Sequence, residues 1–194
     1  MVNNMETILA VITGIGLSAA CGFRIFLPLL AINLASAYGY LHLAPGFEWI
    51  GGHYATVVFV SATILEIVAY YIPWLDNAMD AIASPVSILA GTLATASVIT
   101  DMPPSLKWML AIIAGGGIAG LLQGASAALR AKSSLFTAGL GNTAISTIEL
   151  AGSAITALLA VLLPIIAFVA VFILAIYILI RLGRNFCSKL RGTG

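Results

Sequence analysis

The chain has 194 residues, of which 61% are hydrophobic and 8% are charged, and its formal net charge at pH 7 is +1. Soluble domains carry about 25% charged residues, so this chain has too few polar side chains to cover a water-facing surface. Its small net charge lacks the electrostatic footprint of a protein that binds nucleic acid. Composition, with a mean hydropathy of +1.12, therefore predicts a membrane protein.

The apolar residues form runs long enough to cross a bilayer. A hydrocarbon core about 30 Å thick requires roughly 20 apolar residues in a helix, and only helices or closed barrels satisfy their backbone hydrogen bonds in lipid. The runs do not alternate in polarity as barrel strands do. We therefore predict an all-α fold, a polytopic transmembrane helical bundle of about six crossings in contact with the lipid bilayer. The long runs without Asp, Glu, Lys or Arg are residues 7–23, 25–47, 49–65, 81–100, 108–129 and 150–180.

Glycines and prolines divide these runs into segments. The first helix, at about residues 6–23, continues as an apolar stretch to residue 40, and this stretch either spans the membrane or re-enters it. Residues 41–53, which are rich in glycine, are expected to form a loop. Pro73 is expected to end the helix before it, because proline interrupts the hydrogen bonds of a helix interior. The later helices are expected at about residues 54–72, 82–100, 105–130, 142–163 and 165–181.

Basic residues near the ends of the spans predict the orientation. Lys and Arg are enriched on the cytoplasmic side, and the tail from residue 181 onward carries four of them, so we place the C-terminus in the cytoplasm. Counting backwards puts Arg130 and Lys132 on the same side and the loop at residues 41–53 outside. If residues 6–40 make one net crossing, the N-terminus is also inside.

The two halves of the chain resemble each other. Residues 8–16 align without gaps on residues 109–117, and each Gly-rich segment leads to an arginine and then to a helix with one isolated glutamate. With three crossings in each half the repeats are inverted, a common transporter plan with the site near the bilayer midplane. If the stretch after residue 24 spans fully, the repeats are parallel, and Gly, Ala and Leu also recur in any membrane helix. The predicted units are a first repeat at residues 1–101, a second repeat at 105–185 and a basic cytoplasmic tail at 186–194.

Two glutamates lie inside apolar helices. Glu66 and Glu149 cannot easily reach the headgroups, and a charge at the bilayer centre costs roughly 3 kcal/mol on insertion scales. Each must therefore face a partner, a cavity or a proton. One hypothesis is that these carboxylates couple solute movement to protons or cations. The other is that they are structural, either protonated or paired with Arg24 or Arg130.

Three further charged residues have two interpretations each. Asp76 and Asp80 are four residues apart, so on a helix they share a face and could hold a cation or form the mouth of a pathway. They also follow Pro73, and negative charge stabilises a helix N-terminus. Arg24 lies where the first helix is expected to break, and it could pair with Glu66, bind an anionic solute, or extend to the interface.

Small residues at four-residue spacing favour helix packing over ligand binding. Such spacing lets backbones approach closely, either within one chain or across a homodimer. The predicted packing positions are Gly14, Ser18, Gly22, Gly116, Gly120 and Gly124.

The sequence offers no motif for catalysis, a metal or a cofactor. His42 and His53 flank the outer loop, but their spacing is loose and no third His or Cys supports a zinc site. Cys21 and Cys187 are far apart and are expected to be free thiols. Because no nucleophile, phosphate-loop or dinucleotide motif is present, we expect neither an enzyme nor a bound cofactor.

Three segments carry a family resemblance: the early Gly-x-Arg-aromatic-Pro pattern at residues 22–28, an acidic motif within 66–80, and a polar stretch within 142–149. In these segments the chain resembles a family of small bacterial membrane proteins known only as a domain of unknown function. Residues 70–71 are Tyr-Tyr where that family is expected to have Asp-Lys, and Leu150 stands where another acid is expected. The resemblance implies no activity, but it implies one site made of Arg24, Glu66, Asp76, Asp80 and Glu149.

The leading hypothesis is a small transporter or channel in the bacterial inner membrane, for an unidentified small solute, proton or cation. Glu66 and Glu149 would titrate near the repeat interface, Arg24 would balance or recruit charge, and Asp76 and Asp80 would line the cytoplasmic mouth. The alternative is a non-catalytic structural protein that binds lipid or another membrane subunit through its Gly-rich faces.

Overall fold

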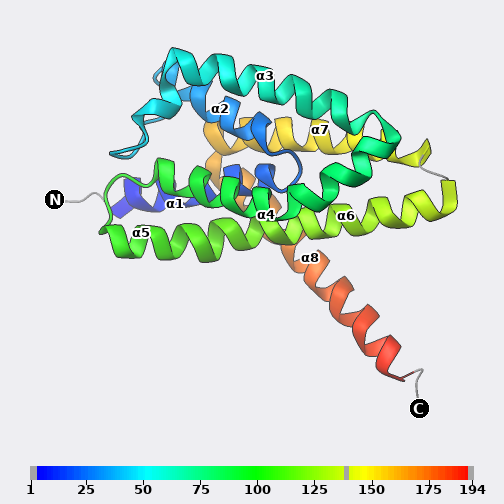
Figure 1. Ribbon diagram of the computed structural model, residues 1–194. Helices are drawn as coiled ribbons and strands as arrows, with labels where there is room; N and C mark the ends of the chain where they lie inside the picture. Colours follow the sequence, from blue (N-terminus) through cyan, green and yellow to red (C-terminus); the bar gives the residue numbers. More distant parts are fainter. Residues whose placement is uncertain (1–3, 138–139, 192–194) are drawn as a thin grey trace.

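Figure 1 presents a computed structural model of the protein, which describes residues 4–137 and 140–191. The side chains at positions 73, 74, 76, 77, 140, 182 and 185–191 lie outside this description. The described part contains helices and no strands, so the all-α prediction is confirmed.

Several helices begin at prolines, and one of them begins at Pro73, whereas the sequence predicted that this helix starts near residue 82. Pro73 and Pro104 each stand in the first turn of a helix, where a missing N–H leaves no intrahelical bond unmade. A π-helical stretch, η2, joins two α-helices into one continuous rod at residues 104–137. The elements are α1 (Asn4–Cys21), α2 (Phe26–Ala37), the 3-10 turn η1 (Glu48–Gly51), α3 (His53–Tyr70), α4 (Pro73–Val98), α5 (Pro104–Leu110), η2 (Ala111–Gly116), α6 (Gly117–Thr137), α7 (Leu140–Leu162) and α8 (Pro164–Arg191).

Among the described residues, six helices are long and apolar enough to cross a membrane. Their number confirms the prediction of about six crossings. Large apolar side chains cover their outer faces, with Leu65 69% and Ile148 71% exposed; lipid is the solvent that suits such a surface. The candidate spans are Asn4–Cys21, His53–Tyr70, Ala78–Val98, Pro104–Thr137, Gly141–Leu162 and Pro164–Arg181.

The short helix α2 turns back instead of crossing. Its 12 residues reach about 18 Å at 1.5 Å per residue, well short of a hydrocarbon core of about 30 Å. Of the two alternatives for residues 25–40, re-entry is therefore the one that the fold adopts. Figure 1 shows α2 running back beside α1 toward the end of the bundle where the chain starts.

This hairpin changes the predicted side of the N-terminus. Helix α1 runs antiparallel to α4, because Thr95 Oγ1 donates a hydrogen bond to Gly14 O at 3.0 Å and Gly91 lies against Ser18. The loop after α2 reaches the same end of α4, where Ala44 N donates to Ser97 O at 2.7 Å. The premise of one net crossing by residues 6–40 is therefore wrong. The chain begins at the end that holds residues 38–52, which we name the loop end; the opposite end, where α3 ends and α4 begins, is the charged end.

The inverted relation between the halves is not confirmed. The two Gly-rich helices α1 and α6 run in the same direction, since both cross α4 antiparallel to it. The two glutamate helices α3 and α7 run in opposite directions, because Ser146 near the start of α7 donates to Tyr70 O at the end of α3. An inverted repeat requires every matched pair to be antiparallel. The α1–α2 hairpin brings the chain back to the loop end, so α3 starts there, whereas α7 starts at the charged end.

Candidate functional site: a buried charge cluster

The break between α1 and α2 is held by a side chain from another helix. The Glu66 carboxylate on α3 accepts hydrogen bonds from Ile25 N at 2.7 Å and Phe26 N at 3.0 Å. No side chain of α2 itself caps this N-terminus, so Glu66 satisfies N–H groups that a helix start leaves without partners. Its negative charge also suits the positive end of the helix dipole. Glu66 therefore stabilises the re-entrant hairpin.

Arg130 on α6 joins carboxylates from two other helices. Its Nε donates to Glu149 Oε1 at 3.2 Å and its Nη2 donates to Glu149 Oε2. Its Nη1 donates to Asp80 Oδ1 at 2.7 Å. Ser126, one turn earlier on α6, donates to Glu149 Oε1. The two-pronged contact between a guanidinium and a carboxylate is the strong form of such a pair. Through Glu149 and Asp80, Arg130 therefore joins α6 to both α7 and α4.

Arg24 and Tyr70 extend the cluster to the α1–α2 break. Arg24 Nη2 donates to Ser146 O at 2.9 Å and lies 3.8 Å from Glu149 Oε2. The guanidinium carbons of Arg24 and Arg130 lie 4.0 and 4.2 Å from the centre of the Tyr70 ring. An aromatic ring attracts cations through its quadrupole, so Tyr70 helps to hold two like charges near each other. It does so at a position where the family resemblance predicted an acid.

The cluster is almost fully closed to solvent and lipid. It combines two arginines with three carboxylates, and the exposed fraction is 1% for Arg24 and Arg130, 3% for Glu66, 5% for Glu149 and 15% for Asp80. Charges in such surroundings require hydrogen-bonded partners. The described contacts supply partners across four helices and the α1–α2 break.

The cluster lies toward one end of the spans. Glu66 is four residues, about 6 Å, from the end of α3, and Asp80 is seven residues, about 10 Å, from the start of α4, at 1.5 Å per residue. The sequence hypothesis placed a transport site near the midplane between repeats. Glu66 and Asp80 lie toward the charged end, as do Arg130 and Lys132, whereas Glu149 is nine residues, about 14 Å, from the start of α7 at 1.5 Å per residue.

The fold brings together four of the five predicted site residues, Arg24, Glu66, Asp80 and Glu149. The side chain of Asp76 lies outside the described residues. Sequence reasoning gave Arg130 only a pairing role, although it is the most connected member of the cluster. The sequence did contain a signal for Arg130: it follows a Gly-rich segment in the second half, as Arg24 does in the first half.

Several of the predicted packing positions lie against α4. A Cβ on Gly14 would meet the Thr95 backbone at 3.0 Å, and one on Gly120 would meet Ile88 at 2.9 Å. Ser18 donates to Gly115 O, a carbonyl of the π-helical stretch. Gly124 differs, because a Cβ there would meet nothing within 4 Å.

Two further packing positions also lie at helix contacts. A Cβ on Gly22 would meet Ala119 O at 2.7 Å, and one on Gly116 would meet Thr92 Oγ1 at 2.7 Å.

The candidate metal ligands of the sequence do not gather into a site among the described residues. These residues contain no group of three His, Cys, Asp or Glu side chains that could hold a metal ion. Cys21 is a buried free thiol, and the Cys187 side chain lies outside the description.

Comparison with known proteins identifies the family. Residues 11–184 match the family described as Domain of unknown function (DUF4126). No curated protein and no solved structure matches the chain. Because the match covers most of the sequence, including every charged residue of the cluster, the protein belongs to the DUF4126 family of multi-pass helical proteins.

Proposed function

We propose that the protein is a small membrane transporter or channel for a small solute or ion. The observation that carries the proposal is the buried charge cluster, in which Arg24, Arg130, Glu66, Asp80 and Glu149 meet at a broken helix. Ionisable residues within membrane segments are costly, and they commonly mark ion pathways and proton relays.

A purely structural contact could be made with apolar residues at lower cost. Replacing a buried ion pair by well-packed apolar side chains is often neutral or stabilising, so stability alone does not explain Arg130 and Glu149. Discontinuous helices that direct backbone groups at charged ligands are a recurring feature of transporters. Here the start of α2 is directed at the Glu66 carboxylate. The combination favours a role in moving or coupling charge.

In this proposal the cluster is a gate, and the ion pairs of Arg130 with Glu149 and Asp80 are its closed state. The pairs of Arg130 with Glu149 and with Asp80 join α6 to α7 and α4, so a pathway between these helices opens only when the pairs separate. An entering cation could replace a guanidinium at the carboxylates, and a proton could neutralise one of them. Each event weakens the pairs that hold the helices together, which couples the ion to the opening.

The proposed orientation follows from the basic residues. Lys132 lies near the charged end, and α8, which carries Arg181 and Arg184, leaves the bundle obliquely (Figure 1). The positive-inside tendency then places the gate and the C-terminus at the cytoplasmic side of a bacterial inner membrane. The start of α1 and the loop end would face outward.

The test is flux through the purified protein in liposomes. We expect time-dependent uptake of protons, or of one member of a panel of small cations and anions, that is lost in the Glu149→Gln variant. Glu48→Gln is the matched control, because Glu48 is exposed and bonds only to Gly46 N, two residues away, among the described contacts. Full transport by the Glu66→Gln/Glu149→Gln double variant would contradict the proposal.

The competing function is a non-catalytic structural protein that binds another subunit through small-residue faces. The observation in its favour is the exposed small-residue face of α6 at Gly117 and Gly124, where an added Cβ would meet nothing within 4 Å. It predicts that the glutamate variants behave as wild type in every flux assay. It also predicts that Gly124→Leu, which would place a large side chain on this exposed face, disrupts assembly in a membrane extract.

A further inference from the structure

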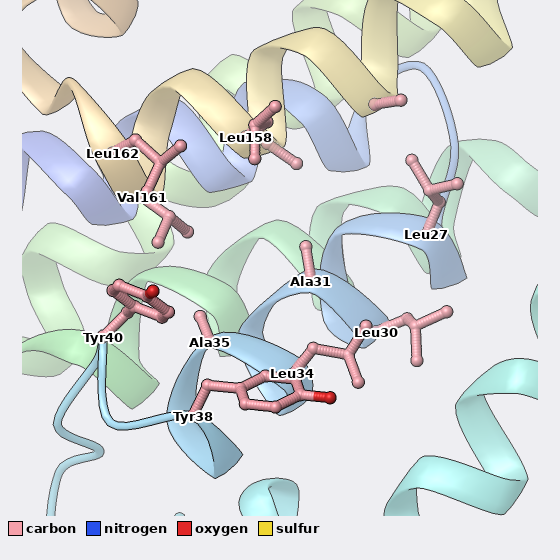
Figure 2. A pocket seen from close by; sticks show the side chains of 12 residues that line it. Leu27, Leu30, Ala31, Leu34, Ala35, Tyr38, Tyr40, Leu158, Val161 and Leu162 are labelled. Carbon is pink, nitrogen blue, oxygen red and sulfur yellow. The ribbon is translucent and has the colours of Figure 1, made fainter.

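A deep apolar groove separates α2 from α7. Its volume is about 560 Å³, and Figure 2 shows its two walls, with Leu30, Ala31 and Leu34 on α2 and Leu158 and Val161 on α7. The only polar side-chain groups among its lining residues are the hydroxyls of two tyrosines, Tyr38 and Tyr40. The groove continues into the exposed apolar surface of the bundle, where Leu34 is 40% and Leu158 58% exposed.

The groove has about the length of one membrane leaflet. Helix α2 forms one wall along its 12 residues, about 18 Å, while half of a hydrocarbon core of about 30 Å is about 15 Å. One end of the groove is at Leu27, directly after the helix break, and the other is at Tyr38 and Tyr40 near the loop end. The groove therefore extends from the membrane interior to one interface.

The two tyrosines mark the interface end. Tyr38 is 77% and Tyr40 70% exposed, and aromatic side chains with a polar tip are enriched at the level of lipid headgroups. Both tyrosines line the groove, and its remaining lining residues have hydrocarbon side chains. A molecule that matches this pattern has a polar head at the loop end and a flexible apolar chain along α2.

We propose that this groove binds one acyl chain of a phospholipid from the loop-end leaflet, with the headgroup at Tyr38 and Tyr40. A helix from a second copy is a poorer match, because a helix about 10 Å wide carries no polar head to place at Tyr38 and Tyr40 while its remaining surface lies along an apolar lining. A single acyl chain is narrow and flexible enough to follow it. The bound acyl chain would cover the outer side of α2, a helix that is too short to span the membrane. This inference does not depend on transport.

The test is native mass spectrometry of the purified protein during graded delipidation, with phosphatidylglycerol added back as the probe. Val161→Trp places a large side chain inside the groove. Val58→Trp makes the same change on the outer face of α3, where Val58 is 59% exposed and lies outside the groove. We expect wild type and Val58→Trp to retain one phospholipid per chain after bulk lipid is removed, and Val161→Trp to lose it.

A second variant addresses the headgroup without filling the groove. Tyr38→Phe/Tyr40→Phe keeps both rings and removes both hydroxyls, and we expect it to fold as wild type and to lose its lipid at an earlier delipidation step. The proposal is overturned if Val161→Trp retains the phospholipid as well as Val58→Trp does. It is also overturned if wild type is a dimer that Val161→Trp converts to monomer, since the groove would then hold a second copy. Equal retention by the double tyrosine variant would refute the headgroup position.

Discussion

Replacing Glu66 by glutamine should loosen the re-entrant hairpin. The wild-type carboxylate accepts two backbone hydrogen bonds, from Ile25 N and Phe26 N, while a glutamine side chain has one accepting oxygen and one NH2 donor. One N–H would therefore face another donor in a site where Glu66 is 3% exposed. Hydrogen bonds to charged groups contribute about 1.5–3 kcal/mol each. We expect Glu66→Gln to lower the free energy of unfolding by about 2 kcal/mol, and Glu66→Ala by about 4 kcal/mol.

Two measurements check this expectation in detergent or nanodiscs. For a chain of this size a loss of about 2 kcal/mol lowers Tm by roughly 4–8 °C, which thermal unfolding resolves. Hydrogen exchange followed by mass spectrometry reports on the peptide that contains Ile25 and Phe26. We expect that peptide to exchange faster in Glu66→Gln, because exchange follows the free energy of local opening.

The control is Glu48→Gln, which makes the same chemical change at an exposed site and should shift stability by no more than about 0.5 kcal/mol. If Glu66→Gln melts with wild type and its hairpin amides stay equally protected, Glu66 is not the cap of α2. The account of why the chain turns back at Arg24 would then be wrong.

Three further changes test other parts of the fold. Arg130→Lys keeps the charge but removes the planar fork that bonds Glu149 and Asp80, so we expect a loss of about 2–3 kcal/mol in thermal unfolding; unchanged Tm would mean that the fork contributes nothing. Gly22→Ala would push a Cβ against Ala119 O at 2.7 Å and should destabilise by about 1–3 kcal/mol, whereas Gly124→Ala, with open space, should be neutral or slightly stabilising; equal effects would refute the packing at Gly22. In a Cys187→Ser background, a membrane-impermeant maleimide should label Glu48→Cys in intact cells and label Lys132→Cys only after lysis; the reverse pattern would invert the orientation.

The sequence by itself determined the fold class and the approximate spans. Charge-free runs long enough to cross a bilayer leave only helices as a solution. Helices α5 and α8 begin at Pro104 and Pro164, close to the expected residues 105 and 165, whereas α4 begins at Pro73 and not near residue 82. The sequence also pointed to Arg24 and Glu66, because a charge inside an apolar helix stands out against its neighbours. These inferences rest on local composition and spacing, which a single segment reveals without its partners.

Only the tertiary structure decided which charges meet and which way the first hairpin runs. Whether residues 26–37 cross or turn back depends on Glu66, a partner some 40 residues away that satisfies the N–H groups at the break. The central position of Arg130 depends on α4, α6 and α7 converging at the charged end. The groove between α2 and α7 is lined by residues more than 100 positions apart in the chain, such as Leu30 and Leu158. Such contacts join residues far apart in the chain, so hydrophobic periodicity, which is a local property, carries no information about them.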